Sequence, residues 1–166
     1  GGRSEFHGKG RGRSGAARQQ DRYRPLGRPE VLKVLQSQDM LPAITFIFSR
    51  AGCDGALYQC LRSRMVLTSQ EEAQQIKDIV DAGVEGIPEE DLQVLDFKRW
   101  REALSRGFAA HHAGMLPAFR HIVEDLFVRG LVRAVFATET LALGINMPAR
   151  TVVLEKLIKF NGEAHV

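Results

Sequence analysis

The sequence predicts an α/β fold in which a mostly parallel β-sheet is flanked by helices. Short apolar runs of strand length alternate with segments whose apolar residues recur every three or four positions. The runs are continuous rather than alternating, which is typical of strands buried on both faces of a parallel sheet. In such a fold, ligands bind at the carboxyl ends of the strands.

The composition of the 166-residue chain is that of a globular protein. Hydrophobic residues make up 44% and charged residues 26%, which excludes wholesale disorder, a collagen-like repeat and a coiled coil. No apolar run approaches the roughly 20 residues that span a bilayer, and the N-terminus shows no apolar signal segment. With only two cysteines, the sequence favours a cytoplasmic protein that does not engage a membrane.

The charge is concentrated at the N-terminus. Residues 1–28 carry a net charge of +6, whereas residues 29–166 carry −3. The segment 1–28 is rich in glycine and arginine and poor in apolar side chains, so we expect a disordered basic linker ahead of a folded domain at 29–166. This linker either contacts nucleic-acid phosphates by charge alone or is a solvated spacer or cloning remnant.

The first folded elements follow in order. A short helical stripe over 31–35 ends before Pro42, and the apolar run 43–48 predicts a strand. The next helix carries Cys53 and Cys60 on one face. Core packing is the favoured role of these cysteines, because a redox pair more often has the Cys-x-x-Cys spacing.

The middle of the chain predicts helices. Ser69 and Glu72 have the spacing of a capping box and open one helix, which Gly83 ends. Pro88 opens the next helix, which we expect to continue through Trp100 toward residue 107. Trp100 is expected to be a packing anchor, with base stacking as the alternative.

The last third repeats the strand–helix alternation. We expect a strand over 108–111, a loop over 112–116 and a helix from Pro117 to Gly130. Strands are then predicted at 132–137 and 151–155, with a short helix between them.

Three polar clusters follow predicted strands, at Ser49-Arg50, at 112–114 and at 138–140. The carboxyl ends of parallel strands meet at one edge, so these clusters are expected to lie together. Hydroxyl groups, free backbone N–H groups and an arginine suit phosphate oxygens. Helix capping is the alternative role of the serine and threonines.

Two other kinds of site are disfavoured. A metal site would use His111, His112 and His121, but adjacent strand residues point to opposite faces and no carboxylate stands at ligand spacing. We therefore expect no metal site. A serine hydrolase is disfavoured because no Gly-x-Ser-x-Gly motif is present.

Three ordered motifs resemble the bacterial branch of the superkiller-type (Ski-like) DExH RNA helicases of superfamily two. Phe-Ile-Phe-Ser-Arg-Ala-Gly-Cys-Asp at 46–54 resembles motif IV. His-His-Ala-Gly-Met-Leu-Pro at 111–117, with Val-Glu-Asp-Leu-Phe at 123–127, resembles the histidine signature. The run 136–149 resembles motif V. The resemblance implies a RecA-like fold and covers the whole predicted folded part.

The resemblance also implies roles for residues. Motif IV would contact a nucleic-acid backbone through Ser49 and Arg50, and the histidine signature through His112 and Gly114. Motif V would contact a phosphate through its threonines and face ATP at its end. The implied residues of motif V are Thr138, Thr140, Gly144 and Asn146.

The family places two RecA-like domains around ATP and a strand, and this chain resembles the second domain. No Walker A motif, DExH box or motif VI is present. We therefore expect a C-terminally incomplete fragment, inactive alone, of an ATP-dependent RNA helicase. ATP and Mg²⁺ would be bound mainly by the first RecA-like domain, and no catalytic residue is assigned within this chain.

The expected partners are that first domain and single-stranded RNA, with DNA as the alternative strand. Two other functions stay open. One is a nucleic-acid binding module without ATPase activity, which the basic linker favours. The other is a RecA-like scaffold whose loops are merely capped.

Overall fold

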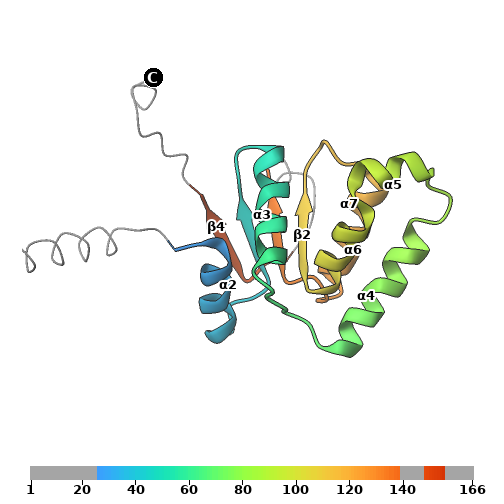
Figure 1. Cartoon of the computed structure of the whole chain (residues 1–166). Coiled ribbons are helices and arrows are strands. Elements are labelled where there is room, and N and C mark those ends of the chain that lie inside the picture. Colours follow the sequence, from blue (N-terminus) through green and yellow to red (C-terminus); the bar gives the residue numbers. More distant parts are fainter. Residues whose placement is uncertain (1–25, 139–147, 156–166) are drawn as a thin grey trace, which may run out of the picture.

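The computed structural model describes residues 26–138 and 148–155. Helices and strands alternate through most of this part of the chain (Figure 1). The elements are α2 (Arg28–Ser37), β1 (Ala43–Phe46), α3 (Arg50–Arg62), α4 (Gln70–Gly83), α5 (Glu89–Leu95), α6 (Phe97–Ser105), β2 (Phe108–His111), α7 (Pro117–Val128), β3 (Ala134–Ala137) and β4 (Thr151–Leu154).

The described strands form one all-parallel sheet in the order β2-β3-β1-β4. The predicted α/β class with flanking helices is therefore confirmed, and the arrangement is consistent with a RecA-like fold. β2 and β3 are buried at every residue, as the continuous apolar runs predicted. β4 lies at the edge, where Val152 and Leu154 are exposed.

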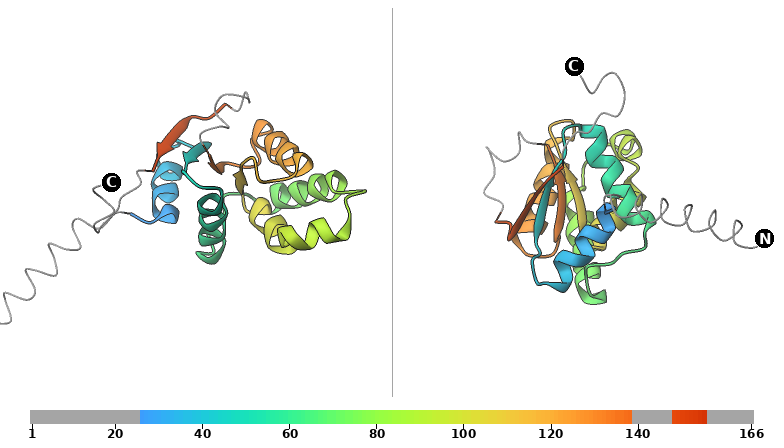
Figure 2. Two further views of the ribbon diagram at one scale, coloured as in Figure 1. Left: turned by 90° about the horizontal axis from the view of Figure 1, so that it is seen from above. Right: turned by 90° about the vertical axis from the view of Figure 1, so that its left-hand side faces the viewer.

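The helices fall into two groups. The view from above shows α2 and α3 against one face of the sheet, while α4 to α7 gather beside β2, away from β4 (Figure 2). None of the described helices is both long and apolar enough to cross a membrane.

The core lies between the sheet and these helices. Cys53 and Cys60 are fully buried and unpaired on the inner face of α3, so their predicted packing role is confirmed. Trp100 is 2% exposed and packs against Phe97 and Phe119, with ring centroids 6.2 and 5.3 Å away. It is a packing anchor rather than a surface for stacking bases.

The prediction of one continuous helix from Pro88 to residue 107 is wrong. The chain breaks at Asp96, which adopts the left-handed conformation with φ 57° between α5 and α6. Aspartate tolerates this conformation better than most residues. The break lets α6 bury Trp100 and Leu104 in the core, whereas α5 buries none of its residues.

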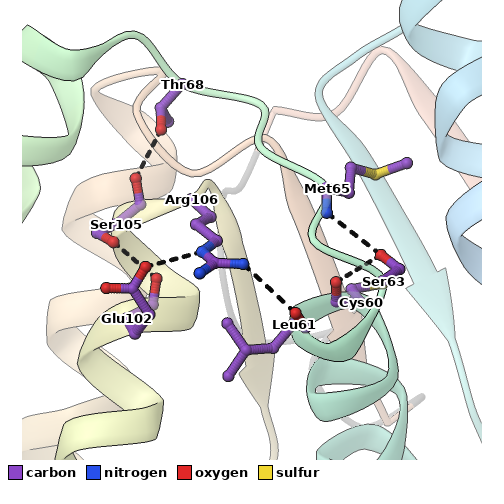
Figure 3. Close-up of polar contacts among 8 residues, drawn as sticks. All are labelled: Cys60, Leu61, Ser63, Met65, Thr68, Glu102, Ser105 and Arg106. Carbon is purple, nitrogen blue, oxygen red and sulfur yellow. Dashed lines mark hydrogen bonds and ion pairs between the residues drawn. The ribbon is translucent and has the colours of Figure 1, made fainter.

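The amino edge of the sheet is held by side chains that bond to backbone carbonyls (Figure 3). Arg106, just before β2, donates to the Glu102 carboxylate at 2.7 Å and to the Leu61 carbonyl at the end of α3. The Thr68 hydroxyl donates to the Ser105 carbonyl at 2.6 Å. These bonds join the ends of α3 and α6 to the segment that leads into α4.

A second set of contacts joins the first and last described elements. Arg28 is the first residue of α2, and its guanidinium forms a two-pronged ion pair with Glu155 at 2.7 and 2.8 Å. It also donates to the Gln59 side chain on α3. The residue that ends the predicted basic linker is therefore fixed to the folded domain.

Candidate nucleic-acid interface

The segments after β1, β2 and β3 leave the sheet at the same edge. Phe46 pairs with Ala137, and Ala137 pairs with His111, so the three strands end in register. The carboxyl ends of these three strands, at the top of Figure 1, therefore bring residues 47, 112 and 138 to one edge of the sheet.

Ser49 caps α3. Its hydroxyl oxygen accepts a hydrogen bond from the Gly52 N–H at 2.9 Å, which satisfies one of the free N–H groups of the first helical turn. A side chain at Gly52 would place its Cβ 2.8 Å from both the Ser49 hydroxyl and the Ile47 side chain. The first turn is thus closed tightly on the end of β1.

Arg50 is the first residue of α3 and is exposed. Its guanidinium has no ion-pair partner within residues 26–138 and 148–155. Its stem lies against Gly114, where a Cβ would meet the Arg50 Cδ at 3.2 Å. The start of α3 and the loop after β2 are therefore in contact through these two residues.

His112 lies in the loop after β2 and is 6% exposed. Its Nε2 is 3.0 Å from the Asp54 carboxylate on α3, and its Nδ1 accepts from the Gly114 N–H at 3.1 Å. His112, Gly114 and Arg50 are thus brought together, as the sequence predicted for the strand ends.

His111 points elsewhere. Its Nε2 is 2.6 Å from the Glu124 carboxylate on α7, whereas His112 turns to α3. Burial lowers the pKa of His111 below 6.5, and the opposing pull of Glu124 does not overcome this effect. At neutral pH the lowered pKa favours the neutral ring, whose Nε2–H donates a hydrogen bond to the Glu124 carboxylate.

Thr138 follows β3 directly and is half-buried at the same edge. The strand end before it is held by the Ile47 N–H, which donates to the Ala137 carbonyl at 2.8 Å. The other predicted residues of motif V, Thr140, Gly144 and Asn146, lie outside the described residues.

A cleft of about 450 Å³ adjoins this edge, between α3, the α5–α6 break and the loop after β2. Asp54, Tyr58 and Arg99 lie on its walls, and the Arg99 guanidinium stacks 4.1 Å above the Tyr58 ring. Sequence reasoning assigned no role to Asp54, although it ends the motif IV run. Its spacing from His112 gave no signal, because the contact joins residues 58 positions apart.

The described part of the chain holds no set of side chains that could bind a metal ion. No group of three or more histidine, cysteine or acidic side chains gathers there. The two residues that the resemblance assigns to ATP, Gly144 and Asn146, fall outside it.

The two cysteines have no reactive character. Burial raises the pKa of both Cys53 and Cys60 to about 12, so each is a protonated thiol at neutral pH.

Comparison with known proteins identifies relatives of this chain, although no family model matches it. It is 65% identical over 144 residues to "Probable helicase HelY" of Mycobacterium tuberculosis. These aligned residues cover 87% of this chain and 16% of the relative. It is 46% identical over 136 residues to the chloroplastic DExH-box ATP-dependent RNA helicase DExH15 of Arabidopsis thaliana, covering 80% of this chain and 11% of the relative.

A more distant relative is the antiviral helicase SKI2 of Saccharomyces cerevisiae. The two are 32% identical over 134 residues, which cover 81% of this chain and 10% of the relative. The chain thus spans a sixth or less of the length of these proteins. These matches confirm the resemblance carried by the three motifs: in sequence, the chain corresponds to one segment of the superkiller-type DExH helicases.

Proposed function

We propose that the chain is part of the second RecA-like domain of an ATP-dependent RNA helicase and that its carboxyl edge holds a nucleic-acid strand. The observation that carries the proposal is the convergence of Arg50 with the His112–Gly114 loop at the edge where Thr138 also emerges. Relatives named as RNA helicases support it.

The proposed chemistry is recognition of the sugar–phosphate backbone. The Arg50 guanidinium supplies charge-assisted hydrogen bonds to a phosphate, and the exposed loop at Gly114 lets a strand approach the backbone closely. Contacts of this kind do not read sequence, so binding is expected to be tolerant of sequence and weakened by salt.

The parent protein would bind ATP and Mg²⁺ mainly in its first RecA-like domain, with Gly144 and Asn146 facing the nucleotide from this one. Hydrolysis would drive opening and closing of the two domains along the strand. The 166-residue chain alone is expected to hydrolyse no ATP, and an ATPase rate that persists through purification would contradict this expectation.

The decisive experiment measures binding of a fluorescent 20-nucleotide oligouridine by anisotropy, in the full chain and after removal of residues 1–25. The deletion stops there because Arg28 begins α2 and pairs with Glu155. Salt-sensitive binding should survive the deletion, and Arg50→Ala or Thr138→Ala should each weaken it. If neither substitution changes the affinity, the proposed strand path is wrong.

The second candidate is a binding module that works through its basic leader, because residues 1–28 carry the net positive charge of the chain. It predicts that binding disappears when residues 1–25 are removed.

Competition with oligothymidine in the same assay separates RNA from DNA, since only RNA offers a 2′-hydroxyl.

A further inference from the structure

One side chain joins α3 to the loop after β2. The His112 ring lies between them, with Nε2 3.0 Å from an Asp54 carboxylate oxygen and Nδ1 3.1 Å from the Gly114 nitrogen. The His112 side chain is 7% exposed, whereas that of Asp54 is half-exposed. The ring is thus enclosed and held at both of its nitrogens.

These two contacts fix the tautomer of His112. The Gly114 nitrogen has only a proton to donate, so Nδ1 must accept and carries no proton. The proton of the neutral ring therefore sits on Nε2, from which it is donated to Asp54. Asp54 selects the one form of the ring that can accept the Gly114 N–H.

The loop is tightly packed at Gly114, where there is no room for a side chain. A Cβ built on Gly114 would lie 3.1 Å from the His112 Nδ1, 3.2 Å from its Cε1 and 3.2 Å from the Arg50 Cδ. The ring, the loop backbone and the arginine stem are in mutual contact. A rotation of the ring would shift the loop relative to Arg50.

We propose that Asp54 is a positioning residue for the strand-binding edge: its carboxylate orients the His112 ring, which holds Gly114 against Arg50. The inference rests on the proposed function of this edge. The Asp54 carboxylate would otherwise be unfavourable at this edge, because its negative charge repels a bound nucleic-acid strand. Holding His112 gives it a role.

The charge of Asp54 and its hold on His112 have opposite effects on RNA affinity, so the direction of the change tells them apart. Loss of the Asp54 charge alone should strengthen binding to RNA, whereas loss of its hold on His112 should weaken it. In the full chain, Asp54→Ala is expected to weaken binding of the oligouridine by about fivefold, the equivalent of one hydrogen bond. Asp54→Asn should bind at least as tightly as the unsubstituted chain, because the amide oxygen still accepts from Nε2 while the negative charge is gone.

Asp91→Ala is the matched control. Asp91 lines the same cleft, and its substitution removes the same charge, but its side chain forms no hydrogen bond or ion pair with the described residues of the loop after β2. It should leave the affinity unchanged or slightly raise it. If Asp54→Ala binds as tightly as Asp91→Ala, or more tightly than the unsubstituted chain, the positioning role is refuted.

A second measurement reports on the ring itself. Long-range ¹H–¹⁵N spectra of the full chain, with the His112 signals assigned through His112→Gln, should show the Nε2–H tautomer, and Asp54→Ala should lose this preference. The spectrum of the unsubstituted chain tests the inference even where Asp54→Ala does not fold. An Nδ1–H tautomer there would overturn it.

The two readouts separate this inference from the function it rests on. If the unsubstituted chain shows the expected tautomer but binds no RNA, the proposed function fails and the strand-binding role of Asp54 fails with it, although its hold on His112 stands. If the chain binds RNA and Arg50→Ala weakens binding while Asp54→Ala does not, the inference alone fails.

Discussion

The two edges of the sheet use their polar side chains differently. At the amino edge, arginines are bound to carboxylates and to backbone carbonyls: Arg106 to Glu102 and Leu61, and Arg133 to Glu72 and Leu67. At the carboxyl edge, Arg50 is exposed and has no ion-pair partner among the described residues. These two arginines of the amino edge therefore join elements. At the carboxyl edge, Arg28 does the same through its pair with Glu155, which follows β4, whereas Arg50 has no such partner among the described residues.

If the proposed function holds, the difference separates arginines that stabilise the fold from an arginine that binds the strand. Glu72 caps α4 with Ser69, and the Ser69 N–H and the Arg133 guanidinium together lower the pKa of this carboxyl. Arg50 forms no comparable ion pair with a carboxylate among the described residues. Substitution of Arg133 at the amino edge should affect folding, and substitution of Arg50 at the carboxyl edge should affect binding.

The largest expected effect concerns α3, the helix that runs from one edge to the other. Because burial raises the pKa of both thiols to about 12, their thiolate fraction at pH 8 is orders of magnitude below that of a free cysteine. Cys53 and Cys60 should react correspondingly slowly with an aromatic disulfide reagent until the chain is unfolded in denaturant. Rapid reaction of the folded chain would mean that α3 is not packed as described.

The amino edge is tested by Arg133→Met, which keeps the apolar stem and removes the guanidinium. It should lower the free energy of unfolding by about 1.5 kcal/mol, because Glu72 and the Leu67 carbonyl lose their partner at a half-buried site. Urea titration measures the change. Arg129→Met is the control, since its pair with Asp125 is largely exposed and contributes about 0.5 kcal/mol or less. If Arg133→Met also changed the RNA affinity, the assignment of stability to the amino edge and binding to the carboxyl edge would be wrong.

The carboxyl edge is tested by comparing two exposed arginines of the same helix. Arg50→Ala, at the start of α3, should weaken oligouridine binding by about fivefold and leave the free energy of unfolding unchanged. Arg62→Ala removes the same charge at the end of α3 and should leave the affinity almost unchanged. Equal losses in the two variants would mean that net charge, rather than this edge, governs binding.

The smallest effect concerns pH. Burial lowers the pKa of His111 below its value of 6.5 in the unfolded chain, so protonation favours the unfolded state. The contribution of His111 to stability is complete above pH 6.5 and is lost as the pH falls below it. Urea titrations between pH 7.5 and 5.5 should show this decline, and His111→Gln should reduce it. A decline of the same size in His111→Gln would assign it to another group.

Much of the fold could be predicted because its causes are local. The capping box at Ser69 and Glu72, the apolar run that became β1 and the stripe that became α7 all formed where expected. The break at Asp96 could not be predicted, since a left-handed aspartate leaves the helical spacing on either side intact. The break accompanies the docking of Trp100 into a core built from distant elements, a contact that local spacing does not encode.

For the candidate site, the sequence alone determined which residue types follow which strands, since strand ends are marked by local patterns of hydrophobicity. Only the tertiary structure decided which of them meet. The parallel register places Arg50 beside Gly114, and the fold brings Asp54 to His112 across 58 positions of sequence. Such contacts depend on how helices and strands pack, and no spacing along the chain encodes them.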